Sequence, residues 1–475
     1  MYDVIVVGGG VIGGLILREL TKYNLRVCLV EKANDVCMGQ SKANSGIVHA
    51  GYDAKTGTQK AKFNLLGNRM MEKVAQELGV KYSNIGSLVV AFSEEECSAL
   101  QTLKERGEKN GVSGLRILDR EELHRMEENI SSEAVAALYA PTGGIVCPYS
   151  LTVAAVGNAM DNGADLHLLF EVEKIEKTEN GLTVSAKDGR ALQGKTLVNC
   201  AGIKSGEIAA MVGDEINVNG RKGEYILLDR ESGGFVKHTL FFAPTEKGKG
   251  ILISPTVDGN VLLGPTAEEV DDGNTETSGA GIETVMEKAR KMCKNVPFFN
   301  TITSFAGTRA YAAEHDFILR ESERTEGVFH CAGIESPGLT AAPAIAEHVV
   351  KNLLSTRLKL EKNKNFSPYR KADYFFKDLS REEKNELIKK DPSYGKIVCR
   401  CEGITEGEIR RAVRENPPAL DTDAVKRRTR AGMGRCQGGF CQSQVMEIIA
   451  QERGVALEEV TKKGKNSYII RGRTK

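Results

Sequence analysis

The chain opens with two short apolar runs, separated by a glycine-rich turn and an amphipathic stretch. Residues 2–7 read YDVIVV and residues 26–30 read RVCLV, and uninterrupted apolar runs of this length are typical of strands buried on both faces of a parallel sheet. The turn reads GGGVIG at residues 8–13, and the amphipathic stretch continues to about Lys22. The pattern therefore predicts a strand–helix–strand unit at the start of the chain.

Later segments change between helical and strand-like patterns. Apolar residues at helical spacing predict helices over 60–78 and 93–110. Between residues 220 and 267, short apolar runs alternate with glycine-containing turns, which is typical of the hairpins of an antiparallel sheet. Buried-strand patterns return at residues 197–202 and 328–333. The order of these patterns predicts a parallel sheet whose strands are separated along the chain by the strands of an antiparallel sheet.

The last third of the chain is more strongly charged. A helix predicted over about 340–354 is followed by residues 355–395, which contain Lys and Glu runs and are expected to form a solvated helical linker. The sequence TEGE at 405–408 matches a capping box. It predicts the start of a helix that buries Ile409 and Val413.

Composition and charge narrow the class of protein. Of the 475 residues, 41% are hydrophobic and 27% charged, an ordinary balance for a globular protein, and no run approaches the ~18 apolar residues that span a bilayer. The 65 basic and 64 acidic side chains nearly cancel, which disfavours a nucleic-acid binder that works through net charge. Because no signal-peptide pattern precedes the first strand, we expect a cytoplasmic protein, peripheral to a membrane only through partner subunits.

The glycine turn has the features of a dinucleotide-binding site. Gly8, Gly10 and Gly13 form a G-x-G-x-x-G sequence between a strand and a helix, and Glu31 follows the last glycine by 18 positions. The glycines let a pyrophosphate approach the N-terminal amides of the helix. The carboxylate is suited to accept hydrogen bonds from ribose hydroxyls.

FAD fits the rest of the chain better than NAD. After residue 31, a nicotinamide dehydrogenase is expected to continue with alternating strands and helices, whereas residues 39–58 form a loop rich in Gly, Ser, Asn and Lys. A helix that opens within residues 333–340 could also direct its positive end towards a flavin ring. The predicted fold is therefore α/β, with a Rossmann-like FAD domain, an antiparallel-sheet substrate domain and a small helical C-terminal domain.

The expected domains are discontinuous along the chain. The boundaries that we predict are 1–80, 141–220 and 306–370 for the FAD domain, 81–140 and 221–305 for the substrate domain, 371–395 for a linker, and 396–475 for the C-terminal domain with its basic tail.

A loop after the second strand carries a candidate catalytic histidine. Residues 43–53 read ANSGIVHAGYD, and oxidation of an alcohol by hydride transfer requires a base for the hydroxyl proton, a role that suits His49. The alternatives are a histidine that only bonds a loop carbonyl, and the bases His238 and His315. Arg309, in the sequence GTRAY, could hold an anionic substrate through its planar guanidinium or form a surface ion pair.

Five blocks of the chain resemble the flavin-dependent glycerol-3-phosphate dehydrogenases and oxidases, within the D-amino-acid-oxidase-like flavoprotein superfamily. The blocks are residues 41–53, 250–256, 259–266, 307–311 and 333–340, in a resemblance that spans roughly residues 1–370. The resemblance implies His49 as the base and Arg309 as the phosphate ligand. It implies further substrate contacts from Ser45, Lys249, Tyr311 and Ser336. L-2-hydroxyglutarate oxidases share a similar loop, so a 2-hydroxy acid stays open as the substrate.

The residues expected to contact FAD lie at strand ends, in the loop after residue 39 and at the late strand–helix turn. They are Gly8, Gly10, Gly13, Glu31, Lys32, Gln40, Ser41, Asn44, Ser45, Gly46, Val172, Gly202, Gly333, Gly338, Leu339 and Thr340.

Four of the eleven cysteines lie near the end of the chain. Cys399 and Cys401 form C-x-C, and Cys436 and Cys441 form C-x4-C after 34 intervening residues. Four thiolates hold a zinc ion or a [2Fe–2S] cluster, and the spacing differs from the usual C-x2-C pairs of zinc sites; unliganded thiols are the third alternative. The segment resembles the bacterioferritin-associated-ferredoxin-like domain, most specifically at residues 430–441. That resemblance implies a [2Fe–2S] cluster.

Together these observations predict an enzyme that uses FAD to oxidise sn-glycerol 3-phosphate to dihydroxyacetone phosphate. Electrons are expected to pass through the [2Fe–2S] domain to an electron-accepting partner, either a flavoprotein or an iron–sulfur subunit. Two alternatives stay open: an L-2-hydroxyglutarate-type dehydrogenase or oxidase, and a non-catalytic electron-transfer subunit. The presence of both His49 and Arg309 favours an enzyme.

Overall fold

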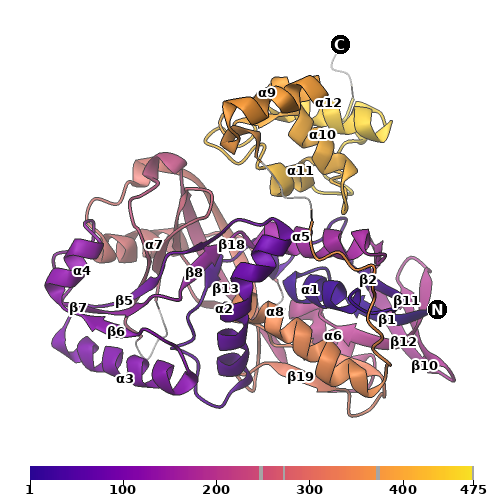
Figure 1. The fold of residues 1–475 in the computed structure, drawn as a ribbon, viewed down its shortest axis with the longest axis horizontal. Helices are drawn as coiled ribbons and strands as arrows, with labels where there is room; N and C mark the ends of the chain where they lie inside the picture. The colour runs from indigo at the N-terminus through magenta and orange to yellow at the C-terminus, as the bar shows by residue number, and fades with distance from the viewer. Residues whose placement is uncertain (245–249, 271–272, 371–374, 473–475) are drawn as a thin grey trace.

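The glycine turn belongs to an eight-stranded sheet on the right of Figure 1. The computed structural model describes residues 1–244, 250–270, 273–370 and 375–472. The strands of this sheet are β1 (Tyr2–Val7), β2 (Val27–Val30), β9 (Asp165–His167), β10 (Val172–Thr178), β11 (Gly181–Ala186), β12 (Ala191–Asn199), β19 (Ile318–Glu321) and β20 (Val328–Ala332). Their order is β10-β11-β12-β1-β2-β9, with β20 paired to β12 and β19 paired to β20. The pairs that include β1, and those of β2 with β9 and β12 with β20, are parallel, as the apolar runs predict.

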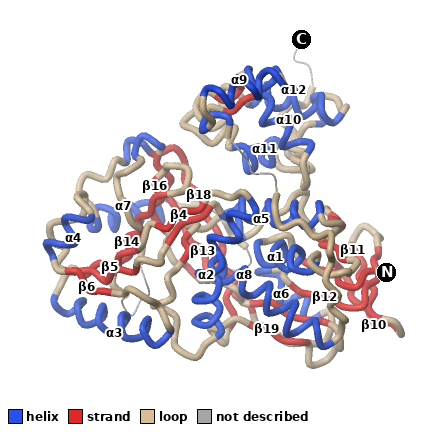
Figure 2. The backbone as a smooth tube through the Cα atoms, in the orientation of Figure 1, coloured by secondary structure: helices blue, strands red, loops and turns tan. Residues whose placement is uncertain are grey.

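Strand β1 is buried on both faces, which explains its uninterrupted apolar sequence. Val4 and Val6 contribute to one apolar core, and Ile5 and Val7 contribute to another. Beside the first core lie the helices α1 (Val11–Leu20), α2 (Gln59–Leu78), α5 (Pro148–Asp161) and α8 (Gly338–His348), and beside the second lies α6 (Ser205–Ala210) (Figure 2). Helices α2 and α8 approach closely at Gly67, where a Cβ atom would lie 2.0 Å from the Thr340 carbonyl oxygen.

A second sheet, on the left of Figure 1, has nine strands in the order β17-β13-β16-β15-β14-β5-β7-β6, with β18 paired to β13. Its strands are β5 (Ser87–Ala91), β6 (Arg116–Leu118), β7 (Ala136–Ala140), β13 (Val218–Leu228), β14 (Thr239–Phe242), β15 (Leu252–Pro255), β16 (Val261–Gly264), β17 (Glu268–Val270) and β18 (Thr301–Ala312). The helices that pack on it are α3 (Glu94–Asn110), α4 (Arg120–Met126) and α7 (Gly279–Met292). Strand β18 runs to Ala312, past the domain boundary that we expect at residue 306.

A small sheet joins the loop of the candidate histidine to the start of α5. It consists of β3 (Ile47–Val48), β8 (Gly144–Val146) and β4 (Tyr82–Asn84), with β8 in the centre. The Val146 amide also donates to the carbonyl oxygen of Gly46 at 2.8 Å. This loop is therefore part of the folded core and not a free surface segment.

The C-terminal domain is a separate helical unit at the top of Figure 1, where α11 lies against α5. It contains β21 (Ile397–Cys399), β22 (Ile404–Thr405), α10 (Glu406–Arg414), α11 (Thr422–Thr429) and α12 (Gln442–Arg453) around its own apolar core. The predicted capping box is present at the start of α10: the Thr405 hydroxyl accepts from the Glu408 amide, and the Glu408 carboxylate accepts from the Thr405 amide. Ile409 and Val413 are buried, as predicted.

The segment before this domain differs from the expected helical linker. Within 355–395 the one α-helix that the described residues contain is α9 (Arg381–Lys390). Residues near 361–370 instead run along the FAD domain, because the Asn24 amide donates to Glu361 and the Asn363 amide donates to Lys22. Charge runs indicated exposure but could not reveal these backbone contacts.

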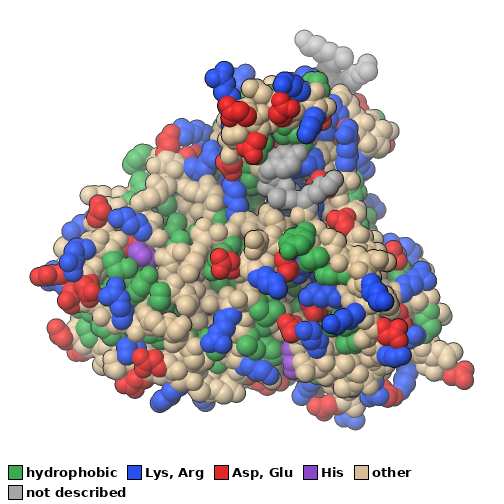
Figure 3. Space-filling view, in the orientation of Figure 1, with side chains coloured by type: hydrophobic (Ala, Val, Ile, Leu, Met, Phe, Trp, Pro, Cys, Tyr) green, Lys and Arg blue, Asp and Glu red, His purple; other side chains and the backbone are tan. Residues whose placement is uncertain are grey.

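Throughout the described ranges, no helix combines the length and apolar character needed to cross a membrane. Acidic and basic side chains are interspersed over the face shown in Figure 3.

Candidate functional site

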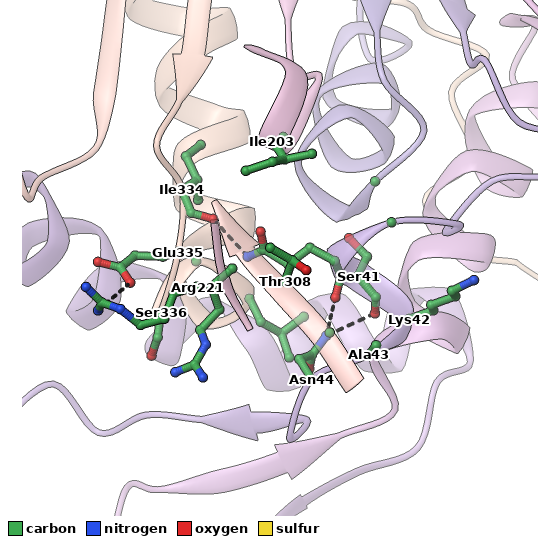
Figure 4. Close-up of a pocket in the computed structure, with 18 of the residues that line it drawn as sticks. Ser41, Lys42, Ala43, Asn44, Ile203, Arg221, Thr308, Ile334, Glu335 and Ser336 are labelled. Atoms are coloured by element: carbon green, nitrogen blue, oxygen red, sulfur yellow. Dashed lines mark hydrogen bonds and ion pairs between the residues drawn. The ribbon is translucent and has the colours of Figure 1, made fainter. Parts of the chain in front are cut away.

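A cavity of about 1820 Å³ lies between the two large sheets. It is lined by the turn between β1 and α1, the loop of residues 38–54, residues 306–309 of β18 and residues 334–339. Figure 4 shows how Ser41 and Asn44 on one side, and Glu335 and Ser336 on the other, surround the same space. The cavity is therefore built from segments that are distant in sequence and that the sequence analysis singled out.

The glycine turn can adopt its shape only without side chains at two positions. Gly8 has φ +108°, and a Cβ atom there would lie 2.4 Å from the Cys200 carbonyl oxygen. A Cβ atom on Gly13 would lie 2.1 Å from the Gly8 carbonyl oxygen. The close packing places Gly10, Val11 and Ile12, at the start of α1, on the cavity wall, where an anionic pyrophosphate is favoured.

Glu31 lies at the end of β2 and is held by the turn itself. Its carboxylate accepts from the Gly9 amide at 2.7 Å and from the Ala33 amide at 2.8 Å. Burial raises the pKa of Glu31, and these two hydrogen bonds oppose the rise. A carboxylate offers ~four acceptor positions, so the fixed group retains capacity to accept from ribose hydroxyls.

The loop after residue 39 connects the two sheets. The Gln40 side chain donates to the Ile334 carbonyl oxygen at 3.1 Å and accepts from the Ala310 amide at 2.9 Å. The Ser41 hydroxyl accepts from the Val11 amide at 2.9 Å. Asn44 bridges the loop internally, because its side-chain amide donates to the backbone carbonyl oxygens of Gln40 and Ser41 (Figure 4).

The structure places most of the expected FAD contacts on the cavity wall. The predicted residues that line it are Gly8, Gly10, Glu31, Lys32, Gln40, Ser41, Asn44, Ser45, Val172, Gly202, Gly338 and Leu339. Gly13, Gly46, Gly333 and Thr340 lie behind the wall. Thr340 acts through another residue, since its hydroxyl accepts from the His49 amide at 2.9 Å.

The backbone of His49 is fixed on both sides. Its amide is held by Thr340, and its carbonyl oxygen accepts from Asn64 at 3.3 Å and Asn68 at 3.1 Å. The imidazole lines the cavity, with Nε2 3.3 Å from the Ser336 hydroxyl. The structure thus brings together two predicted site residues that lie far apart in sequence.

The two other candidate bases do not line this cavity. His238 Nδ1 lies 2.7 Å from the Glu127 carboxylate, and its ring contacts Tyr139 edge-on. His315 is exposed and stacks on Tyr311.

Arg309 lines the cavity from β18. Its Nη2 donates to the Thr266 carbonyl oxygen at 2.6 Å, while its buried Nε has no hydrogen-bond partner among the described residues. Because protein encloses this atom, a ligand in the cavity could meet only the other nitrogens of the guanidinium. The Tyr311 hydroxyl donates to Glu269 at 2.6 Å, and Lys249 lies outside the described residues.

The residues of the cavity wall that the sequence analysis missed include Arg221 and Glu335. Arg221 lies 4.5 Å above the Tyr311 ring and donates to Glu269 at 2.8 Å. Glu335 accepts from Lys60 at 2.8 Å. No sequence signal marks Arg221, because a single arginine in a strand pattern is ordinary. Glu335 lies directly before Ser336, inside the block 333–340, so a closer reading of that block could have found it.

The four C-terminal cysteines form two close pairs, Cys401 with Cys436 and Cys399 with Cys441. Cys401 Sγ lies 3.6 Å from Cys436 Sγ, close to the ~3.8 Å that separates two thiolates bound at ~2.3 Å to one tetrahedral metal. A hydrogen bond from the Cys441 thiol lowers the pKa of Cys399 to about 6, although burial opposes the shift. Two pairs match the four-cysteine ligation of a [2Fe–2S] cluster, in which each iron takes two thiolates.

The chain matches two protein families. Residues 3–352 match the family described as FAD dependent oxidoreductase, and residues 397–451 match the BFD-like [2Fe-2S] binding domain. These matches confirm FAD over NAD and an iron–sulfur site over zinc.

Individual proteins similar to this chain include dehydrogenases and oxidases. It is 48% identical to a glycerol 3-phosphate dehydrogenase of Caloramator mitchellensis, over 100% of this chain and 99% of that protein. It is 34% identical to a glycerol 3-phosphate oxidase of Mycoplasma genitalium, over 77% of this chain and 97% of that protein. The solved structure of the dithionite-reduced L-alpha-glycerophosphate oxidase of Mycoplasma pneumoniae with FAD bound superposes with a TM-score of 0.74 at 31% identity. It covers 78% of this chain and 98% of that one.

Proposed function

Because the chain belongs to the FAD dependent oxidoreductase family and aligns over its full length with a glycerol 3-phosphate dehydrogenase, we propose that it oxidises sn-glycerol 3-phosphate to dihydroxyacetone phosphate. The observation that carries the proposal is the meeting of His49, Ser336 and Arg309 in one cavity. A histidine can remove a hydroxyl proton, and an arginine on the cavity wall can hold a phosphate.

The cavity residues fit FAD. The Gly8–Gly13 turn, Glu31 and the Ser41 loop would hold the pyrophosphate and the adenosine ribose, since they supply helix amides and a fixed carboxylate. Bound FAD supplies the acceptor for the hydride that leaves C2 of the substrate.

His49 is proposed to take the proton from the C2 hydroxyl at Nε2. The Ser336 hydroxyl, 3.3 Å from that nitrogen, would help to orient the substrate oxygen. The backbone contacts of His49 to Thr340, Asn64 and Asn68 keep the ring in place. Preorganisation of this kind lowers the cost of reaching the reacting geometry.

Arg309 is proposed to bind the phosphate, with Ser45, Tyr311 and Lys249 as the further substrate contacts. Its place on the cavity wall supports this role. A phosphate also distinguishes the proposed substrate from free glycerol, which carries no charge for a guanidinium to meet. L-2-hydroxyglutarate carries anionic groups as well, so it is the necessary comparison in any substrate panel.

The C-terminal cysteines fit a [2Fe–2S] cluster, which when bound supplies a one-electron carrier. We infer that an electron-accepting protein, a flavoprotein or an iron–sulfur subunit, approaches this domain. Support comes from the loop between Cys436 and Cys441, where Phe440 is 85% exposed. A redox partner could therefore reach the immediate surroundings of the cluster site.

Product analysis tests the proposal. The full chain loaded with both cofactors is incubated without oxygen with glycerol 3-phosphate and ferricyanide. Dihydroxyacetone phosphate should form, with two molecules of ferricyanide reduced for each molecule of product. Absence of this product, with 2-oxoglutarate formed from L-2-hydroxyglutarate under the same conditions, would assign the 2-hydroxy-acid activity instead.

A further inference from the structure

The C-terminal domain is tied to the FAD domain by a buried carboxylate. Asp35 follows Glu31 in the loop after β2 and is 2% exposed. Arg428 binds both of its oxygens, at 2.8 and 2.9 Å, and Arg427 binds one of them at 2.5 Å. Although burial acts in the opposite direction, the two arginines hold the pKa of Asp35 below its ordinary value. The contact is charged, bidentate and almost free of solvent.

A second buried contact centres on Arg430, at the end of α11. Its side chain reaches two parts of the molecule. Nε lies 2.9 Å from Glu402 of the C-terminal domain, while Nη1 lies 2.7 Å from Asp258 and Nη2 lies 3.0 Å from the Asn260 side-chain oxygen. Arg430 has φ +72°, a left-handed conformation that favours glycine at a helix end. The backbone at this position favours glycine, so the presence of arginine indicates that the contacts of its side chain are needed here.

These contacts involve the loops that carry the cysteines. Glu402 directly follows Cys401, and Arg230 of the substrate domain donates to the Cys401 carbonyl oxygen at 3.1 Å. Asp258 and Asn260 lie in the turn between β15 and β16. The cysteine site is thus anchored to the substrate domain through residues on both sides of it.

A chain of contacts also leads from the cysteine loop to the loop of His49. The Tyr149 hydroxyl, in the first turn of α5, lies 3.3 Å from Arg430 Nη1 and 3.6 Å from Met433 Sδ. Tyr149 follows Val146, whose amide donates to Gly46 at 2.8 Å. Met433 precedes Cys436 by three positions. The cysteine loop therefore packs over the element that supports the flavin-side loop.

We propose that Asp35 and Arg430 are positioning residues that lock the C-terminal domain in one orientation, with its cysteine loops held over α5. A domain fixed in this way would keep a bound cluster at a constant distance from bound FAD. A domain that moved on the preceding segment would not. The role in electron transfer rests on the proposed function. The fixed orientation of the domain does not depend on it. Removal of one partner from a buried ion pair leaves an uncompensated charge, so loss of the two aspartates, Asp35 and Asp258, should release the domain.

The test uses the full chain loaded with FAD and iron–sulfur cluster, as the Asp35→Asn/Asp258→Ala double variant. Neither substitution changes the C-terminal domain, so the cluster site can fold as before. Trypsin cleavage after Arg370, whose guanidinium donates to the Asn416 carbonyl oxygen of the C-terminal domain, should become at least tenfold faster than in the unmodified protein. The electron paramagnetic resonance signal of the reduced cluster should appear at least tenfold more slowly after the flavin is reduced, as the cluster gains one electron that the flavin loses.

A matched control exists at the same interface. Arg435 lies 2.5 Å from Glu231, but the two side chains are 57% and 60% exposed, and exposed pairs contribute little. The Glu231→Ala variant should therefore keep the cleavage rate and the signal kinetics of the unmodified protein. A tenfold change in this control would overturn the assignment of the lock to the two buried contacts.

Wild-type rates of cleavage and of signal appearance in the double variant would overturn the proposal. If the double variant fails to load its cofactors, hydrogen exchange of backbone amides in the unmodified protein tests whether the domain is fixed. Slow exchange of amides in residues 425–433 and 146–152 supports a locked domain, and exchange as fast as in an unfolded peptide contradicts it. Light-driven reduction of the flavin replaces the substrate in a parallel run, so a failure of the proposed function leaves the test of the lock intact.

Discussion

Arg221 and Arg309 face each other directly across the antiparallel pair formed by β13 and β18, and both line the cavity. Like charges in directly opposed positions destabilise a sheet. Arg221 is compensated by Glu269 at 2.8 Å and by Glu335 at 3.9 Å, whereas the Nε atom of Arg309 has no hydrogen-bond partner among the described residues. The pair therefore creates a position at which an anionic group is stabilised.

The first prediction concerns Arg309. The Arg309→Lys variant should raise KM for glycerol 3-phosphate by roughly 10- to 100-fold, the effect of losing a charged hydrogen bond. Lysine keeps the charge but cannot present two coplanar donors. Steady-state kinetics with glycerol 3-phosphate and with free glycerol check this, because the loss should be far larger for the phosphorylated substrate. Equal losses for both would show that Arg309 does not bind the phosphate.

The second prediction concerns Arg221. The Arg221→Met variant should raise KM for glycerol 3-phosphate less than Arg309→Lys does, about 3- to 10-fold, because Arg221 already has two carboxylate neighbours. Arg116→Met is the matched control, since Arg116 also lies over a tyrosine ring, at 5.5 Å from Tyr139, but outside the cavity. A KM unchanged by Arg221→Met would limit the anion site to Arg309.

The third prediction concerns the base. The His49→Ala variant should lower kcat by ~10²–10⁴-fold, the usual contribution of general base catalysis. The absorption spectrum of the bound flavin should change little, because the imidazole is assigned to the substrate. The exposed His315 supplies the control, and His315→Ala should turn over at the unmodified rate. Near-normal turnover of His49→Ala would remove the histidine from the mechanism.

The fourth prediction concerns the cysteines. Replacement of Cys399, Cys401, Cys436 or Cys441 by Ser should abolish the [2Fe–2S] cluster and leave FAD bound, since the C-terminal domain has a separate apolar core. Glycerol 3-phosphate should still bleach the flavin in these variants. Cys97→Ser serves as the control, because Cys97 packs on an apolar core of the substrate domain and not on that of the C-terminal domain. Iron analysis provides the measurement, and an unchanged iron content in the four variants would refute the ligand assignment.

Sequence patterns predicted the parts of the fold that depend on interactions between residues close together in the chain. The strand β1, the glycine turn and the acid at the end of β2 could be recognised because a buried strand and a phosphate-binding helix start leave fixed sequence patterns. The capping box at Thr405 followed from four adjacent residues. His49 could be proposed because hydride transfer from an alcohol requires a base.

The missed features depend on pairings between distant residues. Arg221 meets Arg309 only through the register of β13 and β18. The contact of Asp35 with Arg428 joins residues from opposite ends of the chain. The expected helical linker was wrong over residues 361–370 because residues in that stretch gain backbone partners on the FAD domain. The hydrophobic pattern of one segment does not show which residues of a distant segment will contact it.

Anaerobic titration of the oxidised, cofactor-loaded protein with glycerol 3-phosphate decides whether this is the substrate of the cavity. The flavin absorption should bleach fully with glycerol 3-phosphate, and dihydroxyacetone phosphate should accumulate in the amount of substrate consumed. L-2-hydroxyglutarate and glycerol at the same concentration should bleach the flavin far more slowly. A flavin that stays oxidised with glycerol 3-phosphate, or that L-2-hydroxyglutarate reduces faster, would refute the proposed reaction.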